Sequence, residues 1–213
     1  WYELAMQPLK EREREGVVVR YLSEFHKALS TDQVERISED MKCAHPLFLR
    51  TLLEELRLDS SHERLDERIT AYLRTSGTED LFQRVLERME DDYSTRSVRD
   101  VMTLLWCSRD GLNEDDLQAM TGLSRLKLAT MIGGLDYHLV RKNGLLTFFH
   151  DYLRRAVEKR YLGALRARQE RYRLLADFFE AAEPTLRSTH ETLHALSELA
   201  DQQGLYRVLS SVD

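Results

Sequence analysis

The sequence has little cysteine, proline or glycine, and each shortage excludes a class of protein. Two cysteines in 213 residues, Cys43 and Cys107, are too few for a disulfide scaffold. Both lie in apolar helical surroundings far apart in the sequence, so we expect buried free thiols rather than a disulfide or a metal pair. Three prolines and nine glycines leave few interruptions, which favours a mainly helical protein.

Excess positive charge and long apolar runs are also missing. A formal net charge of −6 and a pI near 5.7 argue against a main role on nucleic acid or an anionic membrane. No apolar run approaches the roughly 20 residues that span a bilayer, and no signal peptide is visible. The sequence therefore predicts a cytoplasmic protein without a membrane partner. Its start at Trp1 rather than Met suggests a segment of a longer protein.

Residues 1–94 have the periodicity of a helical domain with five or six helices. Ser30 and Gln33 form a capping-box pattern at the start of the second helix. Pro46 ends the preceding helix and suits the first turn of the next. That next helix is apolar on most of its circumference, so we expect it to be buried. Residues 59–61 predict a loop after it.

Residues 95–162 have the order of a winged helix, with three helical patterns, a two-stranded hairpin and a last helix. Asn113 is the expected N-cap of the short second helix. The third helix is expected to bury Leu126, Leu128, Met131, Leu135 and Leu139. Apolar runs flank Asn143 and Gly144, which together accept the positive φ angles of a type I′ turn. The hairpin leads to His150, a titratable ring expected beside the positive end of the last helix.

Residues 163–213 predict a helical arm. Its first helix is long and rich in arginine, and Pro184 stops it. Ser188 and Glu191 form a capping-box pattern for the next helix, which is expected to end near Gly204. These helices look like the start of an α-solenoid. The predicted fold class is therefore all-α with one small β-wing and C-terminal helical hairpins.

An H-E-x-x-H string raises the possibility of a zinc site. His190 and His194 are one helical turn apart and could ligate zinc, with Glu191 as general base. The sequence supplies no third ligand, because a metalloprotease continuation would place Gly and His where Ser197 and Ala200 stand. We therefore predict no metal site. No phosphate-binding loop or G-x-S-x-G elbow is present either, so the chain itself is not expected to be an enzyme.

DNA binding is the alternative that the winged-helix pattern leaves open. Arg125 and Lys127 would lie near the start of the recognition helix, and Arg141 and Lys142 in the wing. The same helix has few polar side chains suited to base edges and several large apolar residues, which suit burial against protein. A DNA-binding winged-helix regulator is therefore the second function considered, and nucleic acid is not the expected partner.

Several segments resemble the part of STAND-type signalling ATPases that follows the P-loop core, in the nephrocystin-like and telomerase-associated subgroup. Residues 46–57, P-L-F-L-R-T-L-L-E-E-L-R, are similar to the lid helix of that family. Residues 108–117 are similar to its S-R-x-G-L-S-E-x-E-L segment, and residues 148–162 to F-x-H-x-x-L-R-x-A-V-E-x-R-Y-L. Residues 174–179 and 187–196 resemble the two helices that follow.

The resemblance implies a regulatory segment of a STAND ATPase that acts in nucleotide-dependent autoinhibition and assembly. It divides the chain into a lid domain at residues 1–94, a winged helix at 95–162 and a helical arm at 163–213. His150 would contact the β-phosphate of ADP, and Pro46 would lie beside the base. No catalytic residue is expected in this chain.

The resemblance also implies cofactors and partners. The chain alone would hold no cofactor, whereas the intact protein would bind ADP or ATP. Its partners would be its own upstream P-loop ATPase core and downstream helical repeats, and activation would produce a homo-oligomer.

Overall fold

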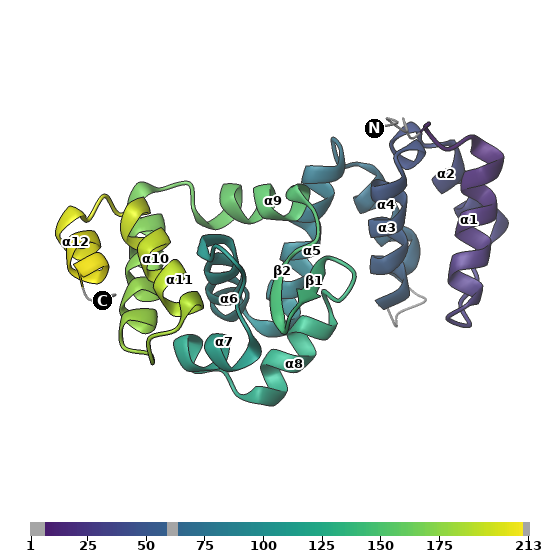
Figure 1. The fold of residues 1–213 in the computed structure, drawn as a ribbon. Helices are drawn as coiled ribbons and strands as arrows, with labels where there is room; N and C mark the ends of the chain where they lie inside the picture. The colour runs from purple at the N-terminus through teal and green to yellow at the C-terminus, as the bar shows by residue number, and fades with distance from the viewer. Residues whose placement is uncertain (1–6, 59–63, 211–213) are drawn as a thin grey trace. The chain divides into compact units, whose positions relative to one another are not determined.

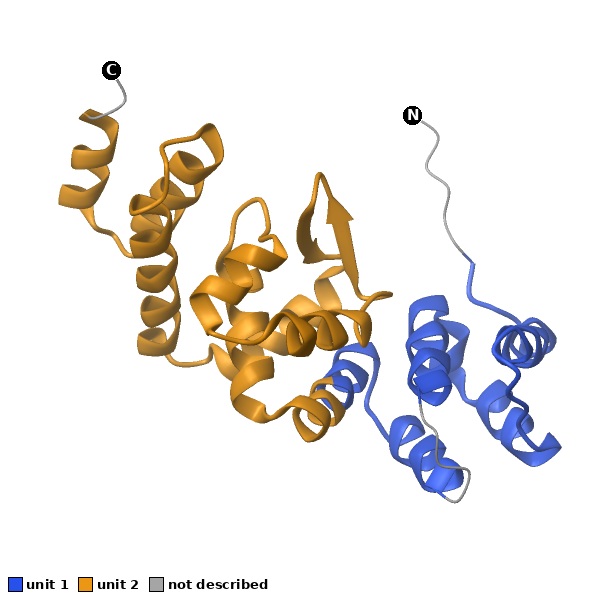
Figure 2. Ribbon diagram, turned by 90° about the horizontal axis from the view of Figure 1, so that it is seen from below, with its two compact units in different colours: residues 1–85 blue, residues 86–213 orange. Residues whose placement is uncertain are grey.

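The structure is a computed structural model that describes residues 7–58 and 64–210. It is mostly helical, with one two-stranded sheet, as Figure 1 shows. This confirms the prediction of an all-α protein with a small β element. The chain forms two compact units, residues 1–85 and residues 86–213, which are coloured separately in Figure 2. The predicted domain boundaries after residues 94 and 162 stay predictions.

The first unit consists of short helices. In chain order they are α1 (Glu11–Ser23), α2 (Thr31–Glu39), the 3-10 helix η1 (Met41–Ala44), α3 (Pro46–Leu58), α4 (Leu65–Leu73) and the first part of α5 (Thr78–Tyr93). Ser30 caps α2: its hydroxyl accepts the N–H of Gln33, whose side chain accepts the N–H of Ser30. The predicted capping box is therefore confirmed. The loop predicted at residues 59–61 lies outside the described residues.

Helix α3 is at the centre of the first unit, as its apolar circumference predicts. Its buried apolar side chains are Phe48, Leu49, Leu52, Leu53 and Leu56. Glu54 and Glu55 are also buried. Glu54 accepts hydrogen bonds from the Tyr21 hydroxyl and from Arg57 Nε at 2.9 Å, and Glu55 accepts one from the Tyr72 hydroxyl at 3.2 Å. Because a buried carboxylate is costly without such donors, these bonds hold α1 and α4 against α3.

The second unit is built around one buried helix, α6. Its elements are the rest of α5, α6 (Thr95–Cys107), α7 (Glu114–Thr121), α8 (Arg125–Gly133), β1 (Leu139–Lys142), β2 (Leu145–Phe148), α9 (Asp151–Tyr161), α10 (Leu165–Glu180), α11 (Leu186–Glu198) and α12 (Gln202–Ser210). Helix α6 packs against α7, α9, α10 and β2. The three helices, hairpin and fourth helix thus follow one another in the predicted order. Cys107 on α6, like Cys43 in the first unit, is a buried free thiol, as predicted.

The β-hairpin has the predicted two-residue turn. Strands β1 and β2 pair antiparallel, with Lys142 opposite Leu145. Asn143 and Gly144 between them have φ angles of 53° and 82°. Two consecutive positive φ angles define the type I′ turn expected from this dipeptide.

The loop between α6 and α7 adds a short bridge to the edge of β2. Leu112 and Leu146 exchange two backbone hydrogen bonds, of 3.1 and 2.8 Å. Gly111 precedes the bridge with a φ of +96°, and a Cβ atom there would lie 2.5 Å from the carbonyl oxygen of Leu146. Only glycine therefore fits this position without movement of the backbone.

Helix α8 is shorter than the sequence suggested. It ends at Gly133, and Leu126, which was expected to be buried, is 76% exposed. The consecutive Gly133 and Gly134 have low helix propensity and let the chain turn before β1. Leu135 and Leu139 are buried as predicted, but from this turn and from β1 rather than from the helix.

The boundaries of α11 and α12 also correct the sequence analysis. Thr185, rather than Ser188, caps α11, and Ser188 is its third residue. The N-cap signal was therefore placed three residues too late. Gly204 does not end a helix but is buried inside α12, where a Cβ atom would lie 2.9 Å from Leu196 Cδ2. The chain instead turns at Ala200, whose φ is 54°. Gly204 thus allows α12 to approach α11 closely.

Candidate functional site

The two residues predicted to contact nucleotide belong to different compact units. Pro46 is the first residue of α3, in residues 1–85. His150 is the N-cap residue of α9, in residues 86–213. The position of His150 at the start of a helix is therefore as predicted. The role of both residues at a nucleotide stays a prediction.

The ring of His150 packs among other aromatic rings. The ring centroids of His138, Phe149 and Tyr152 lie 6.1, 5.8 and 6.5 Å from that of His150, each nearly edge-on. Within the described residues, the His150 side chain makes no capping hydrogen bond to α9. Burial lowers the pKa of His150, and its backbone hydrogen bond and Asp151 oppose that shift. The imidazole is therefore neutral at pH 7 and part of an aromatic cluster.

Two residues of the H-E-x-x-H string bind groups of the protein itself. The Glu191 carboxylate is 1% exposed and accepts hydrogen bonds from the backbone N–H groups of Arg109 and Asp110, at 2.9 and 2.8 Å. His194 Nε2 lies 3.2 Å from the carbonyl oxygen of Cys107. Within the two described ranges, no group of three or more His, Cys, Asp or Glu residues could hold a metal ion. Glu191 therefore binds the α6–α7 loop.

Two opposing effects act on the pKa of Glu191. Burial raises it, whereas the hydrogen bonds from Arg109 and Asp110 lower it, and the net direction is upward. A carboxylate oxygen for each N–H donor makes the ionised form well suited to this loop. Glu191 consequently fixes α11 to the loop that begins at the end of α6.

Arg187 makes a second contact with the same loop, one helical turn before Glu191. Its Nη2 donates to the Asp116 carboxylate and, at 3.2 Å, to the carbonyl oxygen of Gly111. Its guanidinium carbon lies 5.0 Å from the centre of the Phe179 ring on α10. We call Arg187, Glu191 and their hydrogen-bond partners the arm clamp. It joins the helical arm, α10–α12, to the α6–α7 region.

The arm clamp was not predicted from the sequence. Arg187 and Glu191 are four residues apart on a helix, a spacing that by itself suggests an ion pair within the helix. In the structure both side chains instead bind the segment from Arg109 to Asp116. The sequence showed only that two long charged side chains lie on a helix face that also carries apolar residues. This pattern does not identify the loop to which they bind.

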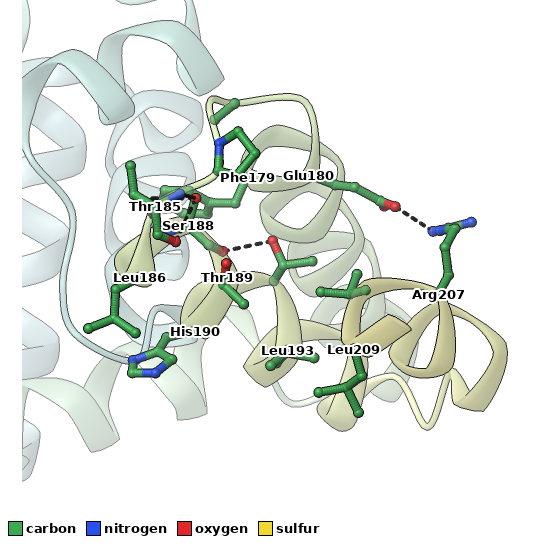
Figure 3. Close-up of a pocket in the computed structure, with 14 residues that line it drawn as sticks. Phe179, Glu180, Thr185, Leu186, Ser188, Thr189, His190, Leu193, Arg207 and Leu209 are labelled. Atoms are coloured by element: carbon green, nitrogen blue, oxygen red, sulfur yellow. Dashed lines mark hydrogen bonds and ion pairs between the residues drawn. The ribbon is translucent and has the colours of Figure 1, made fainter. Parts of the chain in front are cut away.

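The arm also contains an open groove, drawn in Figure 3. The end of α10, α11 and α12 line a volume of about 790 Å³. Most of its lining is apolar: Phe179, Ala182, Pro184, Leu186, Leu193, Val208 and Leu209. We call this the arm groove. Glu180 and Arg207 point toward one another in Figure 3 and form a 2.7 Å ion pair that joins α10 to α12.

The basic residues considered for DNA binding are partly neutralised by α7. Arg125 Nη2 lies 2.8 Å from Asp115, and Arg141 Nη2 lies 2.6 Å from Glu114. These exposed pairs place negative charge beside the positions expected to contact phosphate. That arrangement is poorly suited to a DNA backbone, which is bound by unneutralised positive charge.

Comparison with known proteins finds similarity to two helical repeat proteins. A TPR repeat-containing protein of Dictyostelium discoideum is 27% identical over 183 residues, which cover 83% of this chain and 11% of that protein. Tetratricopeptide repeat protein 41 of Rattus norvegicus is 27% identical over 180 residues, which cover 65% of this chain and 13% of that protein. The chain thus spans about a tenth of the length of these relatives. No family model and no solved structure matches it.

These relatives correct the family assigned from the sequence. Both are named for tetratricopeptide repeats, and neither is named as a signalling ATPase. The assignment to the STAND ATPases is therefore wrong, as is the nucleotide-dependent regulatory function that it implied. The expected partnership with an upstream ATPase core is unsupported, and the relatives give no support to the DNA-binding alternative. No helix in residues 7–58 or 64–210 is long and apolar enough to cross a membrane.

Proposed function

We propose that this chain is a protein-interaction segment of a helical repeat protein and that it catalyses no reaction itself. The names of both relatives, which refer to tetratricopeptide repeats, support this role. So does the arm, in which α11 packs against α10 and α12 against α11. Consecutive helices packed in this way form the extended surfaces on which repeat proteins bind other proteins.

In this proposal residues 95–162 form a winged helix that serves as the base of the arm. The order of three helices, a hairpin and a further helix supports that assignment. Helix α6 contacts both the hairpin and α10, so the base and the arm share one buried helix. The ion pairs of Arg125 and Arg141 with α7 suit a base that contacts protein rather than DNA.

The observation that carries the proposal is the arm clamp. Glu191 binds backbone groups of the α6–α7 loop, and Arg187 binds Gly111 of that loop and Asp116 of α7, so the direction of the arm relative to α6 is fixed. Hydrogen bonds to charged groups contribute roughly 1.5–3 kcal/mol each. A surface held in place before binding loses less conformational freedom when a partner binds, which strengthens the complex.

Quantitative proximity labelling with the full-length protein tests this function. We compare wild type, an Arg187→Ala/Glu191→Ala variant, and an Arg166→Ala/Glu170→Ala control that removes an exposed ion pair of the same arm. We expect a set of proteins labelled equally by wild type and control and about fivefold less by the clamp variant, which corresponds to about 1 kcal/mol. Equal labelling of the same proteins by all three, at equal expression, would contradict the proposal.

A further inference from the structure

We propose that Arg154, held over the ring of Trp106, is a docking point for an aspartate or glutamate side chain of a partner protein. This inference rests on the proposed function, since it names the chemistry of a partner that the interaction segment binds. The site lies in the second unit, where α9 and α10 both pack against α6. It shares no residue with the arm clamp or the arm groove.

The charge of Arg154 is not neutralised by the protein itself. Arg154 is exposed on α9, and among residues 7–58 and 64–210 it forms no ion pair with a carboxylate. Arg155 is the other such arginine in residues 86–210, and each remaining arginine of that range pairs with an aspartate or glutamate. The guanidinium of Arg154 is therefore available to a carboxylate from another protein.

The Arg154 side chain is positioned by an aromatic ring. Its guanidinium carbon lies 4.9 Å from the centre of the Trp106 ring, and that of Arg168 lies 5.4 Å from the same centre. Arg168 is itself fixed, because it donates to the Leu162 carbonyl at 2.6 Å and to Glu158 at 2.8 Å. Stacking uses the face of a guanidinium and leaves its N–H edge free for a carboxylate. A side chain held in this way loses less conformational freedom on binding.

Two further hydrogen-bond donors of this cluster have no acceptor in the part of the chain that the structure describes. The indole N–H of Trp106 is buried and unpaired, and the Tyr172 hydroxyl makes no hydrogen bond. The two rings lie 6.4 Å apart. Burial raises the pKa of Tyr172, so the hydroxyl keeps the proton that it can donate. Unpaired donors beside an unpaired cation suit an anion.

The number of free charges favours a carboxylate over a phosphate group. Arg168 and Arg171, which also lie against α6, are already paired with carboxylates. Besides burial, the Glu198 carboxylate raises the pKa of Tyr172, so one negative charge already lies close to the site. A phosphate group carries nearly two charges and is bound by clusters of free arginines. Arg154 alone instead offers the paired N–H donors that a single carboxylate accepts.

A titration with a carboxylate probe tests the inference on the 213-residue chain. The sequence has two tryptophans, so a Trp1→Phe background leaves Trp106 as the fluorescent reporter. We titrate a capped triglutamate peptide, a capped triglutamine peptide and inorganic phosphate at constant ionic strength. We expect a saturable change with triglutamate and an affinity about tenfold weaker in Arg154→Gln. Arg155→Gln, which removes the same charge from the next position of α9, should leave the affinity unchanged.

Three results would overturn the inference. Equal weakening by Arg154→Gln and Arg155→Gln would show that the peptide responds to net charge alone. A triglutamine response as large as that to triglutamate, or tighter binding of phosphate, would assign the site to another ligand. The absence of any saturable response would show that Arg154 binds no carboxylate.

A conservative variant separates the shape of the guanidinium from its charge. Arg154→Lys keeps the charge and loses the planar fork that stacks and binds in a bidentate manner. We expect its affinity for triglutamate to stay about fivefold below that of wild type. An affinity equal to that of wild type would contradict the role of the stacked arginine.

The outcome is separable from that of the proposed function. If proximity labelling in the full-length protein depends on the arm clamp but is unchanged by Arg154→Gln, and triglutamate does not bind, only this inference fails. If partner labelling is independent of the clamp, the proposed function fails whatever the titration shows.

Discussion

The Glu191 carboxylate accepts a 2.9 Å hydrogen bond from the backbone N–H of Arg109, 82 residues earlier in the chain. The bond places the first half of α11 against the loop that leaves α6. The orientation of the arm therefore depends on a few hydrogen bonds, and mutation of the residues that make them can test this dependence.

Replacing Glu191 with glutamine should loosen the arm. An amide of the same size offers one oxygen where the loop presents two N–H donors, so one donor loses its acceptor. We expect Glu191→Gln to lower the free energy of unfolding by about 2 kcal/mol. Urea denaturation measures the change. Glu198→Gln, an exposed position on the same helix, should have almost no effect, and equal effects would show that the bonds to the loop contribute nothing.

The ion pair between Glu90 and Arg160 should make the stability of the folded protein depend on pH below 4.5, the ordinary pKa of a glutamate side chain. Arg160 donates to both oxygens of Glu90, at 2.9 and 2.6 Å, and these bonds lower the pKa of Glu90 below 4.5. The stabilisation is complete above pH 4.5 and is lost as the pH falls through the folded-state pKa. The difference in Tm between wild type and Glu90→Gln should therefore shrink between pH 7 and pH 3. A constant difference would contradict the ion-pair explanation.

Protonation of His150 should change the stability of the folded protein at a higher pH than protonation of Glu90 does. Because burial lowers its pKa, the unfolded chain takes up a proton first as the pH falls below 6.5, and the folded state is destabilised. The Tm of wild type should consequently fall further between pH 7.5 and pH 5.5 than the Tm of His150→Phe, a variant that keeps an aromatic ring in the cluster. Parallel pH profiles would show that His150 titrates alike in both states.

Alanine substitutions at two glycines should change the free energy of unfolding in opposite directions. Gly111→Ala forces a side chain into a positive φ and against the backbone of Leu146, and we expect a loss of more than about 2 kcal/mol. Gly16→Ala, within α1 and with open space around it, should stabilise by about 0.5–1 kcal/mol. Chemical denaturation of both variants tests the pair. Similar effects would mean that the bridge of Leu112 to β2 is not rigid.

Local signals predicted local structure well. The Asn143-Gly144 hairpin, the Ser30 cap and the buried helix after Pro46 were all correct, because backbone conformation or a short apolar pattern determines them. Leu126 and Gly204 were misassigned for a different reason. The exposure of Leu126, and the packing of α12 on α11 at Gly204 where a helix was expected to end, depend on which element lies opposite, and the sequence of one segment does not contain that information.

The family resemblance was misleading because its motif residues make contacts between packed helices, and such contacts do not depend on the activity of the protein. Glu54 and Glu55 of the resembling helix bind tyrosines of α1 and α4. Arg160 of the resembling segment at residues 148–162 binds Glu90. Such residues recur wherever the same helices pack in the same way, whatever the protein does. The arm clamp could not be predicted for a related reason, since its partners are backbone groups of the α6–α7 loop and the Asp116 side chain of α7, far from α11 in the sequence.

The most direct test of the central claim is the partner comparison between wild type, the Arg187→Ala/Glu191→Ala variant and the Arg166→Ala/Glu170→Ala control. If the chain is a protein-interaction segment whose arm is held by the clamp, the clamp variant loses partners that the control retains. If both variants label the same proteins as wild type to the same extent, the clamp is only a structural contact and the proposed role of the arm is wrong.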